Sequence, residues 1–188
     1  DLDKCTLGDF KNADKRLLII GNSFSSSFIN SFKEVLKDNN SVLLTSSWGS
    51  SPVPNIPNNS DWDLANKYYW NKLIPELLKK LKKGDVVFIM SALTEFISGQ
   101  KDLVLLEYGI RDFSNKLSQN SIKLLFLESI PFNFKDNKGN KCDPINATKT
   151  WFNYKNTCDP KYQSKKNFLN ERDDLNRMLN KLENENLL

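Results

Sequence analysis

One segment of the chain says most about its architecture: Leu17-Leu18-Ile19-Ile20-Gly21-Asn22-Ser23-Phe24. Its continuous apolar run predicts a buried strand, and Gly21 marks the end of that strand. Apolar residues at helical spacing begin directly after Ser23. The segment therefore predicts a serine hydroxyl at the carboxyl end of a strand, above the start of a helix.

The alternation of strand and helix continues along the rest of the chain. Glycine, proline and asparagine residues between 49 and 60 predict a loop. Strands that alternate with helices favour a parallel sheet covered on both faces, so the expected fold class is α/β, a three-layer α/β/α sandwich with flavodoxin-like strand order. The expected strands span residues 16–21, 41–46, 86–90 and 122–127, and the expected helical patterns span 25–37, 61–81, 103–117 and 168–182.

The length of 188 residues predicts a single α/β domain over residues 1–188. Within it, residues 129–160 carry little regular patterning and are expected to form a long irregular insertion. The alternation predicts another strand after the last helix, so we expect the C-terminal strand of the sheet to be missing. The first residue, Asp1, is not a methionine, which is typical of a processed or excised fragment.

Parallel strands end at one common edge, where ligand chemistry belongs. We therefore expect Gly21-Asn22-Ser23, Trp48-Gly49-Ser50 and Ser91-Ala92-Leu93, which all follow strands, to lie together. Backbone N–H groups at the start of a helix suit the oxyanion of acyl transfer, which makes Ser23 a candidate nucleophile. The alternative interpretation is that Ser23 is an ordinary helix N-cap.

Composition excludes several classes of partner and cofactor. The 27 basic and 23 acidic residues are spread along the chain for a net charge of +4, which does not indicate a nucleic-acid partner. No apolar run approaches the roughly 20 residues of a membrane span, and no signal peptide is visible. The chain has no histidine, no zinc-ligand spacing and no phosphate-binding glycine loop, so no metal or cofactor is expected.

Three cysteines bear on the cellular compartment. Cys142 and Cys158 flank an irregular segment in two Cys-Asp-Pro triplets and are a candidate disulfide, which would leave Cys5 without a partner. Three cysteines allow three pairings, and the alternative is three reduced thiols in a cytosolic protein. A group of aromatic residues could stack on a sugar near the sheet edge or pack in the core instead. It consists of Trp48, Trp62, Tyr68, Tyr69 and Trp70.

The segment Ile19-Ile20-Gly21-Asn22-Ser23-Phe24 resembles the first block of the SGNH (GDSL-like) hydrolase superfamily, whose motif is Gly-Asp-Ser. The closest form is the SGNH domain fused to integral-membrane acyltransferases that O-acetylate surface sugars, including nematode nose-resistant-to-fluoxetine-like proteins. In these a cysteine and a short linker precede the block, as Cys5-Thr6-Leu7-Gly8 does here. The resemblance covers roughly residues 5 to 182.

This resemblance implies roles for two residues. Ser23 corresponds to the nucleophile and to one oxyanion N–H donor, and Gly49 corresponds to the second-block glycine that supplies another donor. The alternative for Gly49 is an ordinary loop glycine. The implied activity moves or hydrolyses an acyl group, acetyl first of all, on a carbohydrate or other hydroxyl substrate. The implied partners are an acyl donor, a hydroxyl-bearing acceptor and an N-terminal integral-membrane acyltransferase domain, and the implied location is the secretory lumen, the cell exterior or an outward-facing membrane.

Departures from the family pattern keep a second interpretation open. Asn22 replaces the usual aspartate, and Ser91-Ala92-Leu93-Thr94 lacks the asparagine of the third block. The Asp-x-x-His block that activates the serine is expected beyond Leu188, while Asp173 and Asp174 resemble the helix that leads to it and are expected to be solvated. The alternative is therefore a catalytically inactive SGNH-like binding or interaction module. A flavodoxin-like receiver or nucleotide binder lacks the required acidic cluster or phosphate ligands.

Overall fold

The computed structural model describes residues 5–37, 39–54, 56, 61–91, 93, 100–127 and 172–188. Packing divides the chain into two units, residues 1–129 with 177–188 and residues 130–176. The first, here called the sheet unit, holds all the described strands. Of the second, residues 172–176 are described. The predicted insertion at 129–160 lies outside the described residues, and the single domain over 1–188 stays a prediction.

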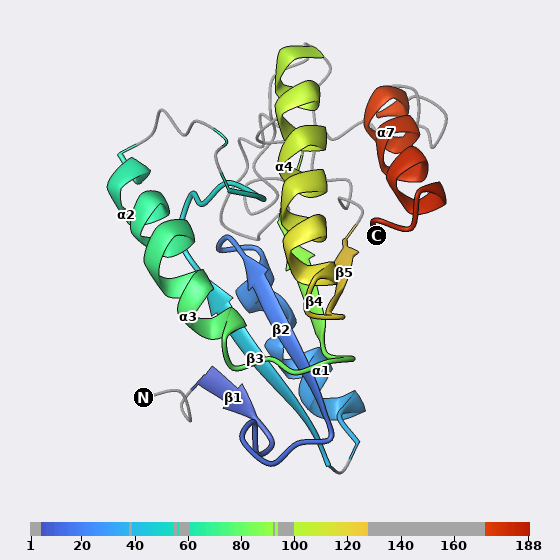
Figure 1. Cartoon of the computed structure of the whole chain (residues 1–188). Coiled ribbons are helices and arrows are strands. Elements are labelled where there is room, and N and C mark those ends of the chain that lie inside the picture. The colour runs from blue at the N-terminus through green and yellow to red at the C-terminus, as the bar shows by residue number, and fades with distance from the viewer. Residues whose placement is uncertain are drawn as a thin grey trace, which may run out of the picture. The chain divides into compact units, whose positions relative to one another are not determined.

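A five-stranded sheet forms the centre of the sheet unit, with the strand order β1-β3-β2-β4-β5 (Figure 1). The four longer strands are parallel, which confirms the predicted α/β class and the flavodoxin-like order. The two-residue strand β1 pairs antiparallel with β3 and was not predicted, because two residues carry no periodicity. The strands are β1 (Thr6–Leu7), β2 (Lys15–Gly21), β3 (Asn40–Ser46), β4 (Val86–Met90) and β5 (Lys123–Phe126).

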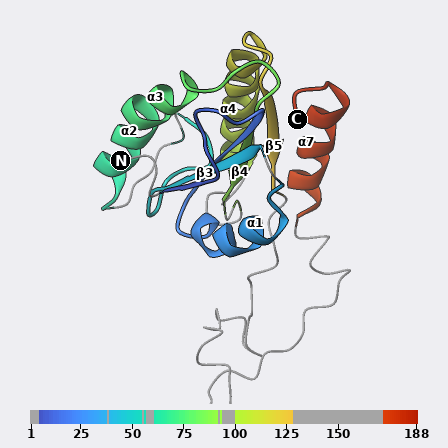
Figure 2. The ribbon, with the colours of Figure 1, turned by 90° about the horizontal axis from the view of Figure 1, so that it is seen from below.

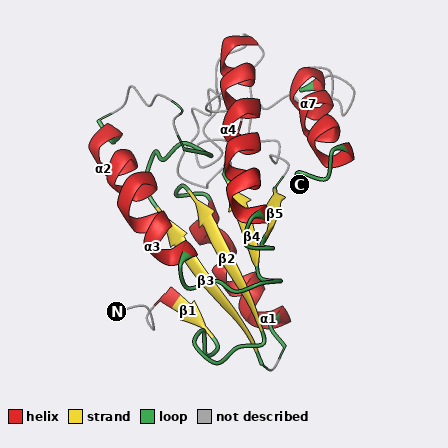
Figure 3. Ribbon diagram, viewed as in Figure 1, coloured by secondary structure: helices red, strands yellow, loops and turns green. Residues whose placement is uncertain are grey.

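Helical segments cover the sheet (Figures 1 and 3). None of those in the described part of the chain is both long and apolar enough to cross a membrane. Residues 168–171 of the last predicted helix lie outside the described residues. The segments are η2 (a 3-10 turn, Ser25–Phe28), α1 (Ile29–Val35), α2 (Asp63–Tyr68), η3 (a π-helical turn, Tyr69–Leu73), α3 (Ile74–Leu78), α4 (Gln100–Ser118) and α7 (Asp173–Asn184).

The helix predicted over 61–81 is interrupted and shorter than expected. It consists of α2, the π-helical turn η3 and α3, and α3 ends at Leu78. Pro75 lies in the first turn of α3 and has no N–H to donate four residues back, so regular α-helical bonding cannot run through it. The π turn absorbs this irregularity and buries two neighbouring aromatic residues, Tyr69 and Trp70.

The sheet separates two apolar layers. On one face, a buried cluster of Ile19, Val42 and Met90 packs against Phe28 and Phe32 of η2 and α1. Figure 2 shows α2, α3 and α4 on the opposite face. There the rings of Trp70 and Phe113 meet edge to face with centroids 5.6 Å apart. Residues Leu18, Ile19 and Ile20 of β2 are therefore buried on both sides of the sheet, which explains the continuous apolar run.

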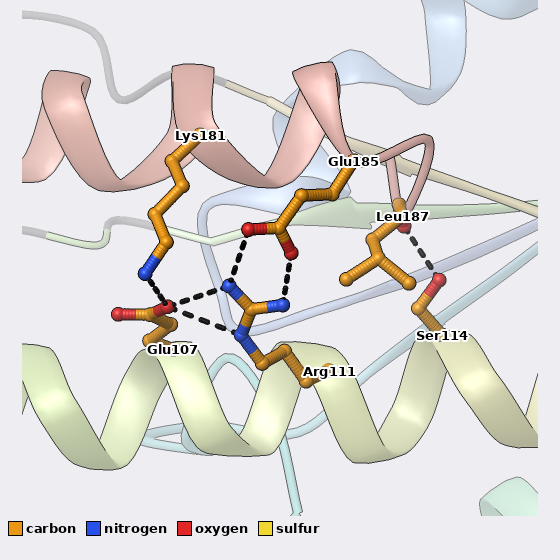
Figure 4. Close-up of polar contacts among 6 residues, drawn as sticks. All are labelled: Glu107, Arg111, Ser114, Lys181, Glu185 and Leu187. Carbon is orange, nitrogen blue, oxygen red and sulfur yellow. Dashed lines mark hydrogen bonds and ion pairs between the residues drawn. The ribbon is translucent and has the colours of Figure 1, made fainter.

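A charged network joins α4 to the C-terminal part of α7 within the sheet unit (Figure 4). The Arg111 guanidinium donates to Glu107 Oε1 from Nε at 3.1 Å and from Nη2 at 2.8 Å, and it also pairs with Glu185. Lys181 Nζ donates to the same Glu107 oxygen at 3.0 Å. Hydrogen bonds from Arg111 and then Lys181 lower the pKa of Glu107, and the Arg111 bond lowers the pKa of Glu185.

We expect this network to stabilise the fold only while its carboxylates are ionised. Because the pKa of Glu107 is depressed in the folded state, its contribution is present above the ordinary value of 4.5 and disappears as the pH falls through the folded value. Glu107→Gln should therefore unfold with a shallower pH dependence below 4.5 than the unaltered protein, measured by urea denaturation at several pH values. Glu183→Gln, an exposed change on α7, should keep the original slope. Equal slopes for all three proteins would show that the pairs contribute nothing.

Candidate functional site

The carboxyl ends of three neighbouring strands meet beside Gly21. In the sheet register Gly21 pairs with Ser46 of β3 and with Met90 of β4. The segments that follow these strands therefore start side by side, as the sequence predicted. They begin at Asn22, Ser47 and Ser91.

The Gly21 carbonyl holds the second segment against the first. Its oxygen accepts a hydrogen bond from the Ser47 N–H at 3.1 Å and another from Ser50 Oγ at 3.2 Å. The buried Tyr69 hydroxyl lies 3.4 Å from the same oxygen, donates to the Thr45 carbonyl at 2.9 Å and accepts from the Gly21 N–H at 3.3 Å. Burial raises the pKa of Tyr69 well above its ordinary value, so the phenol stays protonated and can donate. These bonds fix the loop around Gly49 to the strand that leads to Ser23.

A tight turn connects Gly21 to the first helical turn. The buried Asn22 side chain accepts a hydrogen bond from the Phe24 N–H at 3.1 Å through Oδ1. The Asn22 carbonyl accepts from the Ser25 N–H at 3.0 Å and from Ser25 Oγ at 2.8 Å. Asn22 is not among the described residues with positive φ. It shapes the turn through its side chain.

Ser23 lies at the exposed corner of this turn. Its carbonyl accepts a hydrogen bond from Ser26 Oγ at 2.7 Å, and within the described ranges no hydrogen bond is found for its hydroxyl. The residue that precedes the 3-10 turn is Phe24, without a side-chain cap. The N-cap interpretation of Ser23 is therefore wrong. Ser25 and Ser26 donate to carbonyl oxygens instead of accepting from backbone N–H groups.

Position 21 requires a glycine because neighbouring atoms lie too close for a side chain, and not because of its backbone conformation. A Cβ atom there would overlap the Met90 carbonyl oxygen and lie 2.6 Å from Ser25 Cβ. We expect Gly21→Ala to lower the free energy of unfolding by about 1–3 kcal/mol, because the strand or the turn must shift to make room. Urea denaturation measures this, with Ser27→Ala as a control at an exposed position of the same turn. An unchanged midpoint would mean that the approach is looser than the geometry indicates.

Gly49 lies in the left-handed region, with a φ of +61°. A side chain there would be strained, and a Cβ atom would come within 2.8 Å of Trp62 Cδ1. Ser51, two residues after Gly49, is buried, and its N–H donates to Asn66 Oδ1 at 3.0 Å. The Ser51 carbonyl accepts from Trp70 Nε1 at 3.1 Å. Residues of α2 and η3 thus hold the loop around Gly49 in place through hydrogen bonds to the backbone of Ser51.

The third segment begins at Ser91, which is buried, and no hydrogen-bond partner for its Oγ atom is found among the described residues. Leu93 is also buried, and Ala92 and residues 94–99 lie outside the described residues. This segment follows the strand that pairs with β2 and contributes no charged group up to Leu93.

Other sequence predictions fall outside the sheet unit or outside the described residues. Asp173 and Asp174 are exposed in the first turn of α7, within the second unit, so their solvated state is as expected. Cys142 and Cys158 lie outside the described residues, whereas Cys5 is exposed and forms no disulfide in the described part. Within the described ranges, no group of three histidine, cysteine, aspartate or glutamate residues could hold a metal ion.

Of the five aromatic residues considered as a sugar platform, Tyr69 and Trp70 are core residues. Trp48, Trp62 and Tyr68 are exposed. The sequence placed Ser50 at this edge and included Tyr69 among the aromatic candidates, but it gave no signal for Asn66, whose side chain accepts from the Ser51 N–H.

Comparison with known proteins gives one match. The family model described as SGNH domain (fused to AT3 domains) matches residues 1–187. No curated protein and no solved structure matches the chain.

Proposed function

The chain belongs to the family of SGNH domains that are fused to AT3 domains, and from this membership we propose that it transfers acyl groups through Ser23. The family assignment supports a domain of the hydrolase and acyltransferase kind and confirms the resemblance seen in the first block. One structural observation carries the proposal. The exposed Ser23 lies on a turn whose neighbouring loop, around Gly49, is hydrogen-bonded to the Gly21 carbonyl.

In the proposed reaction, Ser23 Oγ attacks the carbonyl carbon of an acyl donor. The Oγ proton passes to a general base, and the negative charge that develops on the carbonyl oxygen is stabilised by the N–H groups of Ser23 and Gly49. The donor's leaving group departs with a proton, which leaves an ester on Ser23. A hydroxyl group of the acceptor, or water, then attacks this ester and regenerates the serine. The 188 residues contain no histidine, so we place the general base in sequence outside them.

We further propose acetyl as the acyl group and a carbohydrate hydroxyl as the acceptor. The family description includes fusion to AT3 domains, which supports a membrane acyltransferase domain in the same polypeptide. In this arrangement the SGNH domain works on the outward side of a membrane or in the secretory lumen. The acyl group would reach Ser23 by way of the membrane domain.

Trapping the acyl-enzyme tests the proposal. The full-length polypeptide is incubated with p-nitrophenyl acetate, quenched in acid and digested, and the peptide that contains Ser23 is examined by mass spectrometry. We expect one acetyl group on Ser23 and none on the equivalent peptide of Ser23→Ala. Acetylation of another serine, or of no residue, would contradict the proposal.

A catalytically inactive binding module is the second candidate. It is favoured by Asn22 in place of the family's aspartate and by the absence of histidine from the 188 residues. Both candidates share the fold, so only chemistry separates them. A full-length polypeptide that carries no Asp-x-x-His block and never acylates would support the binding module.

A further inference from the structure

Two exposed tryptophans lie at the same edge as Ser23. Trp48 is 66% exposed and Trp62 is 47% exposed, although tryptophan side chains are highly buried on average. Their ring centroids are 5.9 Å apart and their planes are tilted by 59°. Exposed aromatic surface of this kind is typical of a place where a ligand or partner binds.

The pair is fixed to the proposed catalytic loop. Trp48 directly precedes Gly49, and the Trp62 indole lies so close to Gly49 that a Cβ atom there would come within 2.8 Å of it. The loop on which Trp48 lies is hydrogen-bonded through Ser47 and Ser50 to the Gly21 carbonyl. A ligand held by these rings therefore sits beside the N–H group that we assign to the oxyanion.

The surroundings of the pair favour a neutral ligand rich in hydroxyl groups. Residues 42–54 contain no charged residue and include four serines and a threonine. Lys67, the one cation of α2, is paired with Asp63 at 2.6 Å. Within residues 42–54 and α2, an anionic ligand such as a nucleotide phosphate therefore meets no cation other than this paired lysine. Serine hydroxyl and backbone groups can instead exchange hydrogen bonds with a polyol.

We propose that Trp48 and Trp62 form a subsite that stacks a pyranose ring of a neutral carbohydrate. This proposal rests on the proposed acyl-transfer function and identifies the acceptor that the subsite holds. Rings tilted by 59° cannot enclose a flat base between parallel faces. They offer one face and one edge, which suits a ring that is apolar on its axial C–H side and polar at its rim. The bound sugar then presents a hydroxyl group toward the acyl group on Ser23.

Calorimetric titration tests this subsite without turnover. Ser23→Ala protein is titrated with cellotriose and with tri-N-acetylchitotriose, and at least one of them should bind. Adding Trp48→Ala should weaken that binding by about tenfold or more, while Trp48→Phe, which keeps an aromatic face, should restore most of it. Tyr68→Ala, which removes an aromatic side chain of similar exposure (65%) from α2, should bind as the parent does.

Several outcomes would overturn the subsite. These are binding of neither sugar, equal losses for Trp48→Ala and Tyr68→Ala, or binding of adenosine in place of both sugars. Circular dichroism confirms that each variant is folded before titration. Acetylation of Ser23 by p-nitrophenyl acetate needs no sugar, so failure of the proposed catalytic function and failure of the subsite give different results.

Discussion

Replacing Ser23 with alanine is expected to slow acyl transfer by at least about a thousandfold. Without Oγ no ester can form, and the remaining N–H donors stabilise only the direct attack of water, which is far slower. The measurement is release of p-nitrophenolate from p-nitrophenyl acetate by the full-length polypeptide, compared in kcat/KM.

The same substitution should leave the fold unchanged, and this makes the kinetic result easy to interpret. In the described structure the Ser23 hydroxyl is exposed and no hydrogen bond is found for it, so its removal costs no buried contact. Ser27→Ala, at another exposed serine on the same turn, is the matched control and should keep full activity. If Ser23→Ala turned over acetate as fast as Ser27→Ala does, another residue would be the nucleophile or the chain would not be an enzyme.

The inner strands were predictable because a strand that is buried on both faces of the sheet has a continuous apolar run in its sequence. Leu17 to Gly21 and Val86 to Met90 are such runs, and both strands lie inside the sheet with a neighbour on each side. Parallel pairing then brings their carboxyl ends together whatever the loops contain. For this reason Ser23 and Gly49 could be placed at one edge from the sequence.

The details of that edge could not be predicted, because they depend on long-range contacts. On a regular helix, neighbouring residues point about 100° apart, so helical periodicity alone does not predict that Tyr69 and Trp70 are both buried. The π-helical turn makes this possible and delivers the Tyr69 hydroxyl to Gly21 and Thr45. Likewise, nothing local in the sequence shows that the Gly21 carbonyl receives donors from Ser47 and Ser50, which lie more than twenty residues away.

At the opposite end of β2, a buried ion pair joins the starts of two parallel strands. Arg16 is 3% exposed and Asp85 is 1% exposed. Asp85 Oδ1 accepts from the Arg16 N–H at 2.9 Å, and Oδ2 accepts from the Lys82 N–H at 2.7 Å and from Arg16 Nη1 at 3.4 Å. The guanidinium also donates to the carbonyls of Phe10 and Lys11, at 2.8 and 3.0 Å. Nearly every polar group of the pair is thus satisfied inside the protein.

Asp85→Ala is expected to lower the free energy of unfolding by about 3–5 kcal/mol, because it leaves the Arg16 guanidinium buried without its counterion. The loss is measured from the urea midpoint and slope. Asp112→Ala, which breaks an exposed pair with Lys116, should cost less than about 1 kcal/mol. Replacing both charges, as in Arg16→Met with Asp85→Leu, should recover much of the stability. A double variant as unstable as Asp85→Ala would mean that the backbone bonds of Asp85, rather than the charge of Arg16, carry the effect.

The Arg16–Asp85 pair lies at one end of β2 and Ser23 follows the other end, so a change at the pair can affect folding without affecting catalysis. Arg16 and Asp85 directly precede Leu17 and Val86, which lie opposite each other, and the same register places Gly21 opposite Met90 at the other end. Asp85→Ala should therefore reduce the fraction of folded protein while each folded molecule keeps its rate of Ser23 acylation. Active-site titration with p-nitrophenyl acetate, normalised to the folded fraction, measures this. A lower rate per folded molecule would show that losing the pair shifts β2 against β4 and moves the turn that carries Ser23.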